Sequence, residues 1–159
     1  MKLFTIGVYG STEESFFQSL VDNKIDAFCD IRQRRGVRGS QYAYVNSNYL
    51  QARLEELGIK YVYEKALAPT NEIRQKQKDD DKRTGMDKKH RTELGLVFKS
   101  EYTKNILDVF DIDELNHRLV SLGANNIVFF CVEQFPKACH RSLVTARMSR
   151  LYNYEVNHL

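Results

Sequence analysis

The chain has 159 residues, of which 42% are hydrophobic and 28% charged, and its net charge is +3. This length is typical of one domain, so we expect residues 1–159 to form a single domain that folds without disulfide or metal support. No apolar run approaches the ~20 residues that span a bilayer, which argues against a membrane partner. Three cysteines, with no export signal at the N-terminus, predict reduced thiols and a cytoplasmic protein.

Short apolar runs alternate with helical periods along the chain. The runs predict buried strands at 3–8, 27–31, 59–63, 126–132 and 154–159. Helical spacing of apolar residues predicts helices after 11–14, after 46–47, at 94–110, at 112–122, and from the 133–144 turn to about residue 151. Continuous apolar runs are typical of strands that are buried on both faces. The predicted fold class is therefore α/β, a Rossmann-like three-layer domain with about five mainly parallel strands and helices on both faces.

Positive charge is concentrated in two stretches. Residues 70–91 hold eight basic and five acidic residues, and residues 32–38 hold four arginines and no acid. The rest of the chain then carries 12 basic and 16 acidic residues. An asymmetry of this kind favours an anionic partner. Residues 70–91 are too polar for the core, and we interpret them as a charged loop, a solvated helix or an inserted segment.

The turn EQFPKACHRSLV, residues 133–144, joins a predicted strand to a helix. It places Cys139 in the first helical turn, where free backbone N–H groups and the helix dipole favour negative charge. Such a position lowers a cysteine pKa, so Cys139 is a candidate nucleophile, and the alternative is a buried core residue. His140 and Glu133 are the further candidates for catalysis, as groups that transfer a proton.

Charged residues collect where the predicted strands end, which is where open parallel sheets bind ligands. Arg32 follows the second strand and Arg141 lies at the last helix, and both are predicted to bind an anion. Asp30 belongs to the same predicted site, because it could hold either guanidinium in a fork geometry. The alternative is a buried Asp–Arg pair with a structural role alone.

The stretch RQRRGVRGSQYAYVNSNY, residues 32–49, interleaves arginines with tyrosines. Arginine side chains contact phosphates, and tyrosine rings stack on bases. The predicted nucleic-acid contacts are Arg34, Arg35, Arg38, Tyr42 and Tyr44. The alternative is a solvated loop whose tyrosines cover the edge of the core.

The cysteines and histidines do not show the spacing of a structural metal site. Seven residues separate Cys131 from Cys139, and His140 adjoins Cys139. Structural zinc sites use paired C-x-x-C ligands, which this chain lacks. We therefore predict no metal and no cofactor.

Five motifs are spread from the first predicted strand to the last residue. They are TIGVYGST (5–12), DIR (30–32), LEELGIKY (54–61), CVEQFPKACHRSL (131–143) and a terminal HL. Together they resemble the bacterial and archaeal family called domain of unknown function 488. The resemblance implies the α/β fold and a site around the Cys-Glu…Cys-His-Arg block, with no established reaction. The family often has His where this chain has Val8, which implies that any acid–base role there is lost.

The combined prediction is a protein that binds a phosphate-bearing ligand at the carboxyl edge of the sheet. The ligand is a phosphorylated small molecule, such as a nucleotide, or a nucleic acid, and the residues above would cleave it if they do chemistry. Two alternatives remain open. One is a thiolate enzyme that uses Cys139 as its nucleophile. The other is a non-catalytic interaction module whose basic loops dock a partner.

Overall fold

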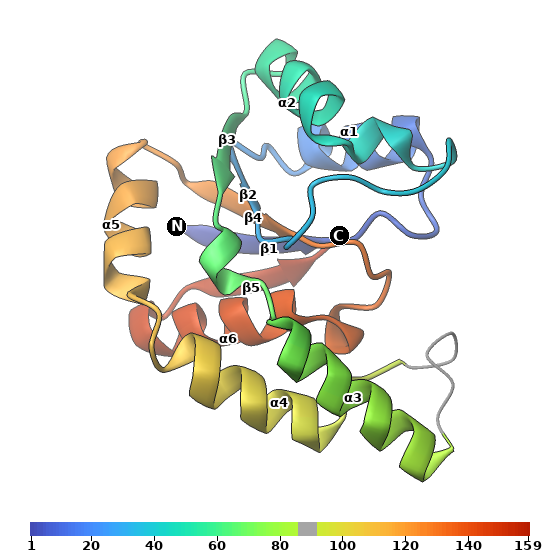
Figure 1. Ribbon diagram of the computed structural model, residues 1–159. Helices are drawn as coiled ribbons and strands as arrows, with labels where there is room; N and C mark the ends of the chain where they lie inside the picture. Colours follow the sequence, from blue (N-terminus) through green and yellow to red (C-terminus); the bar gives the residue numbers. More distant parts are fainter. Residues whose placement is uncertain (86–91) are drawn as a thin grey trace.

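A computed structural model describes residues 1–85 and 92–159 (Figure 1). The described residues form a sheet of five parallel strands in the order β3-β2-β4-β1-β5. The strands are β1 (Lys2–Ile6), β2 (Ala27–Asp30), β3 (Lys60–Tyr63), β4 (Asn126–Phe130) and β5 (Glu155–His158). Each strand overlaps one of the five predicted apolar runs, with β1 beginning at Lys2, one residue before its run, and the predicted parallel sheet is confirmed.

Helices cover both faces of this sheet (Figure 1). The helices on one face are α1 (Glu13–Asp22) and α2 (Ser47–Glu56), and those on the other are α4 (Leu96–Tyr102), α5 (Ile112–Ser121) and α6 (His140–Tyr152). Alternate strand residues supply the two cores: Phe4 packs with α1 and α2, and Leu3 packs with α5 and α6. The three-layer α/β fold is therefore confirmed.

Two helical segments differ from the sequence prediction. The helix expected over 94–110 begins at Leu96 and becomes π-helical over Thr103–Leu107. The wider turn lets the adjacent Ile106 and Leu107 both face the core, where each is buried. A separate 3-10 turn, Pro136–Ala138, precedes the last helix, α6. Cys139 is the N-cap residue of α6.

The charged segment from residue 70 forms α3 (Asn71–Thr84), which Thr70 caps. Ile73 is buried, and the helix packs along α4 while most of its charged side chains stay in solvent. This agrees with the alternative of a solvated helix. Gly85, at φ 68°, ends the helix. The remaining part of the predicted charged segment, residues 86–91, lies outside the described residues.

The connections of the sheet open a crevice at its carboxyl edge. After β2 the chain turns to α2 on one face, whereas after the neighbouring β4 it turns to α6 on the opposite face. Adjacent strands whose connections diverge in this way mark the usual ligand site of a doubly wound sheet. Within residues 1–85 and 92–159, no helix combines the length and apolar character needed to cross a membrane.

Candidate functional site

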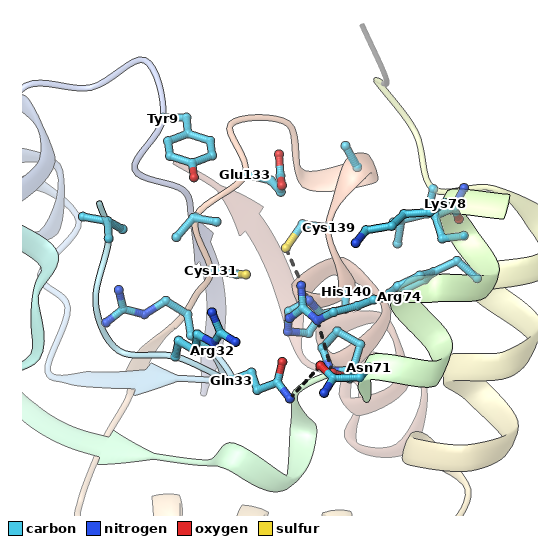
Figure 2. Close-up of a pocket in the computed structure, with 18 of the residues that line it drawn as sticks. Tyr9, Arg32, Gln33, Asn71, Arg74, Lys78, Cys131, Glu133, Cys139 and His140 are labelled. Carbon is cyan, nitrogen blue, oxygen red and sulfur yellow. Dashed lines mark hydrogen bonds between the residues drawn. The ribbon is translucent and has the colours of Figure 1, made fainter. Parts of the chain in front are cut away.

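A cavity of about 800 Å³ lies at this carboxyl edge (Figure 2). One wall is the loop after β2, residues 32–42, the facing wall is α3, and the floor is the 131–140 turn after β4. Its charged lining residues, among those the structure describes, are the basic Arg32, Arg34, Arg38, Arg74, Lys78 and Lys82 and the acidic Asp81 and Glu133. The positive excess makes the cavity suited to an anion.

Arg32 lies in the cavity wall and is held there by Asp30. Its Nε and one terminal nitrogen donate to the two carboxylate oxygens at 2.9 and 2.7 Å, and its backbone N–H donates at 3.1 Å. The Arg32 side chain is 3% exposed and that of Asp30 is 0% exposed. The other terminal nitrogen, Nη1, has no hydrogen-bond partner within residues 1–85 and 92–159. Asp30 thus forms the expected fork, and its partner is Arg32.

Arg141 does not line the cavity. Its guanidinium is fully buried, and its terminal nitrogens donate to the backbone carbonyls of Glu133 and Gln134 at 2.6 and 3.0 Å. Gly7 packs against the same turn, since a Cβ on Gly7 would lie 2.0 Å from the Glu133 carbonyl oxygen. Arg141 therefore ties α6 to the turn that forms the cavity floor, and its guanidinium is not exposed to a ligand in the cavity.

The predicted nucleic-acid contacts divide into two groups. Those that line the cavity are Arg34, Arg38 and Tyr42. Arg35 is not part of the lining, and its guanidinium stacks on the Tyr63 ring with 4.4 Å between the carbon and the ring centroid. Tyr44 is 7% exposed within the α1–α2 core, and its hydroxyl is 2.8 Å from that of Ser11. Tyr44 therefore offers no open face to a ligand.

Three basic residues of the cavity were not among the sequence candidates. Arg74, Lys78 and Lys82 come from α3, and Figure 2 shows Arg74 and Lys78 extending from this helix toward the centre of the cavity. Their spacing of four residues places them on one face of a helix. That spacing is the signal in the sequence that identifies them.

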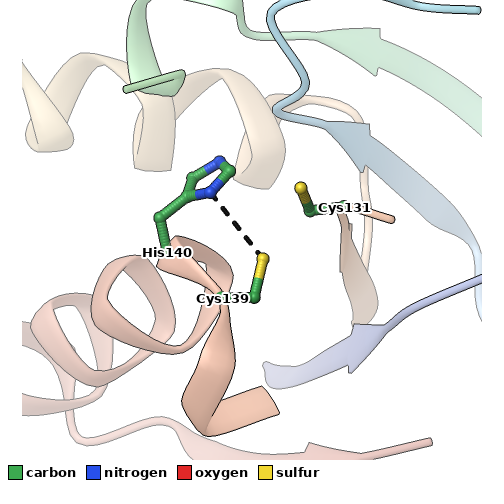
Figure 3. Close-up of side chains that lie close together, drawn as sticks. All are labelled: Cys131, Cys139 and His140. Carbon is green, nitrogen blue, oxygen red and sulfur yellow. Dashed lines mark hydrogen bonds between the residues drawn. The ribbon is translucent and has the colours of Figure 1, made fainter. Parts of the chain in front are cut away.

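The floor of the cavity brings together Cys131, Cys139 and His140 (Figure 3). The Cys139 sulfur lies 3.7 Å from the Nδ1 atom of His140, and the Nε2 atom of His140 lies 3.2 Å from the Ile31 carbonyl oxygen. Because a carbonyl only accepts, Nε2 carries a proton and donates it. Glu133, the third predicted catalytic residue, lies half-buried in the same lining.

The two thiols of the floor have opposite pKa shifts. Burial raises the pKa of Cys139, but a hydrogen bond from Cys131 and the charges of His140 and Arg141 outweigh burial, so that its pKa lies well below the ordinary value. The hydrogen bond to Cys139, together with burial, raises the pKa of Cys131 well above its ordinary value. The pair therefore favours one thiolate and one thiol.

Fold and site together define a doubly wound, Rossmann-like α/β protein with a basic cavity at the carboxyl edge of its sheet. The chain belongs to the family described as "Domain of unknown function DUF488", whose sequence model matches residues 12–148. This confirms the family that the motifs indicate. No curated protein and no solved structure matches the chain.

Proposed function

We propose that this protein is a cytoplasmic protein that binds a small phosphorylated ligand, a nucleotide, in the cavity beside Arg32. The observation that carries the proposal is the Nη1 group of Arg32, which is buried in the cavity wall and has no partner among the residues that the structure describes. A buried donor that stays unpaired costs about 1–3 kcal/mol. A phosphate oxygen at this position would recover that cost through a charge-assisted hydrogen bond.

The charges on the two walls support the same ligand. Arg34 and Arg38 lie on the loop wall, and Arg74 and Lys78 lie on the facing helix. A phosphate group between these walls would meet cations from both sides, whereas a flat basic surface would leave one side in water.

The size and the aromatic rim of the cavity favour a nucleotide over a larger polyanion. Its volume of about 800 Å³ is within the range of roughly 300–1,000 Å³ of small-molecule sites. Tyr9 and Tyr42 line it with ring centroids 5.3 Å apart, and Tyr9 is 41% exposed. Aromatic faces of this kind stack on nucleobases.

The test is calorimetric titration of the purified protein with inorganic phosphate, pyrophosphate, AMP and ATP. The double variant Arg74→Ala/Lys78→Ala should weaken the best of these ligands about tenfold or more, because it removes two charged donors from one wall. The matched control is Lys104→Ala/Arg150→Ala, which removes the same charge from two exposed helical positions outside the cavity. It should retain the affinity of the unaltered protein.

Equal weakening by both double variants would show unspecific attraction and would refute the proposed site. Absence of saturable binding by all four probes would also refute it. A short oligonucleotide that binds while mononucleotides do not would identify nucleic acid as the ligand. Assay of released phosphate or nucleoside in the same samples determines whether the residues of the floor, Glu133 included, cleave what the cavity binds.

A further inference from the structure

The cavity floor has a property that is independent of the basic walls. One ligand atom from each of Cys131, Cys139 and His140 lies within 4.8 Å of the other two, and all three side chains are buried. Figure 3 shows the side chains surrounding a common space, with the Cys139 sulfur pointing between the other two. Two thiols and an imidazole form a donor set that suits zinc.

The distances agree with a tetrahedral site. Zinc binds sulfur at about 2.3 Å and imidazole nitrogen at about 2.0 Å, so a sulfur and a nitrogen ligand at a tetrahedral angle are about 3.5 Å apart. The observed distance from Cys139 Sγ to His140 Nδ1 is 3.7 Å. All three ligand atoms lie within 4.8 Å of one another. A small inward movement of Cys131, or a change of its rotamer, would bring its sulfur to bonding distance of the same ion.

The surroundings prepare His140 to act as a ligand. Its Nε2–H donates to the Ile31 carbonyl, so that in the neutral ring the lone pair is on Nδ1, the atom that faces the Cys139 sulfur. Metal-binding histidines usually donate their second ring N–H to a carbonyl or carboxylate in this way. The ring also packs against Tyr102, with centroids 5.5 Å apart, and Tyr102 donates to the Leu67 carbonyl.

Rigid elements carry the other two ligands. Cys131 directly follows β4, and its backbone N–H donates to Ile6 of β1. Cys139 is the N-cap residue of α6. All three side chains line the cavity, so the position opposite them opens into it.

We propose that Cys131, Cys139 and His140 bind a zinc ion at the floor of the cavity, with a fourth coordination position open to water or to an oxygen of a bound anion. Zinc displaces the remaining thiol proton, and the Nδ1 proton where His140 is charged. These protons pass to solvent, so that two thiolates and one neutral imidazole hold the ion. Three protein ligands with an open fourth position are the arrangement of catalytic zinc sites, Cys₂His among them. This proposal concerns the ion alone and does not require that a nucleotide binds.

The experiment is metal titration of the chelator-treated protein, first with Zn²⁺ and then with Co²⁺ as a spectroscopic probe. One equivalent should bind, and Co²⁺ should give the thiolate charge-transfer absorption of a cysteine-ligated tetrahedral site. Cys131→Ser, Cys139→Ser and His140→Asn should each weaken binding at least about tenfold, because even the loss of a group that only hydrogen-bonds to a metal ligand costs roughly 10–100-fold. The matched control is Cys29→Ala, since Cys29 is also a buried free cysteine but lies within β2 and outside the cluster.

Circular dichroism of each variant separates loss of a ligand from loss of the fold. Alkylation gives a second measure in the unaltered protein: one equivalent of Zn²⁺ should protect Cys139 from iodoacetamide. Labelling at the same rate with and without Zn²⁺ would overturn the zinc site and favour a free nucleophilic thiolate. Full retention of zinc by His140→Asn and both serine variants would overturn it as well.

The double variant Arg74→Ala/Lys78→Ala distinguishes this proposal from the proposed nucleotide site. It leaves the three ligands in place, so it should bind zinc as the unaltered protein does, even where nucleotide binding is lost. In the unaltered protein, failure to bind any nucleotide with intact zinc binding would refute only the first proposal, and nucleotide binding without zinc binding would refute only the second.

Discussion

The buried ion pair between Asp30 and Arg32 should make a single substitution at Arg32 strongly destabilising. In Arg32→Met the Asp30 carboxylate loses both of its hydrogen bonds to the guanidinium and keeps those from the Arg32 backbone N–H and the Tyr61 hydroxyl. It remains in a site that is 0% exposed, without an opposite charge. Removing one partner of a buried ion pair costs about 3–5 kcal/mol.

The expected loss of thermal stability follows from this free energy. For a chain of 159 residues, 1 kcal/mol corresponds to roughly 2–4 °C in the melting temperature, so Arg32→Met should lower it by about 6–20 °C. In Asp30→Asn/Arg32→Met the uncompensated charge is absent, while the asparagine still accepts a hydrogen bond from Tyr61. This double variant should therefore recover most of the loss.

The assay is thermal unfolding followed by circular dichroism, with urea titration as a second measure of the free energy of unfolding. Arg34→Met is the matched control, because Arg34 is exposed on the same loop and should unfold within a few degrees of the unaltered protein. If Arg32→Met costs less than about 1 kcal/mol, or if the double variant is no more stable than the single one, the charge pair is not what stabilises this position.

Three further predictions concern other parts of the fold. Gly7→Ala should lower the melting temperature more than Gly36→Ala. The methyl added at Gly7 would lie 2.0 Å from the Glu133 carbonyl oxygen, whereas the atom nearest to a Cβ on Gly36 is 3.7 Å away. Equal melting temperatures of the two variants would contradict the close approach at Gly7. Burial lowers the pKa of His158 below its ordinary value of 6.5, so the unfolded chain binds a proton at this residue more readily than the folded chain does. The free energy of unfolding should therefore decrease as the pH is lowered below 6.5. His158→Gln should therefore lose less stability between pH 7.5 and 5.5, and an identical loss would exclude this contribution. Burial also raises the pKa of Cys29, whose side chain is 0% exposed, so mass spectrometry after native iodoacetamide treatment should find Cys29 unlabelled.

The pattern of apolar residues by itself determined the architecture of this protein. Runs such as IVFF (127–130) are apolar on both faces of the strand, and a parallel sheet between two helical layers is the structure that buries both faces. Capping was equally local, since Thr12 and Thr70 each accept a hydrogen bond from a backbone N–H in the first turn of the following helix. The carboxyl edge followed as the place of the site, because all parallel strands end there.

Only the tertiary structure decided which charged and sulfur-containing side chains meet. Asp30 had two candidate partners, and it pairs with Arg32 while Arg141 is engaged by backbone carbonyls eight and seven residues before it. Cys131 and Cys139 stand at opposite ends of the turn that joins β4 to α6. The turn folds back on itself, which places their sulfurs close together. The basic face of α3 likewise meets the arginine loop only through the packing of α3 against α4. Spacing along a chain reports local periodicity, whereas these contacts depend on how the elements pack across the fold.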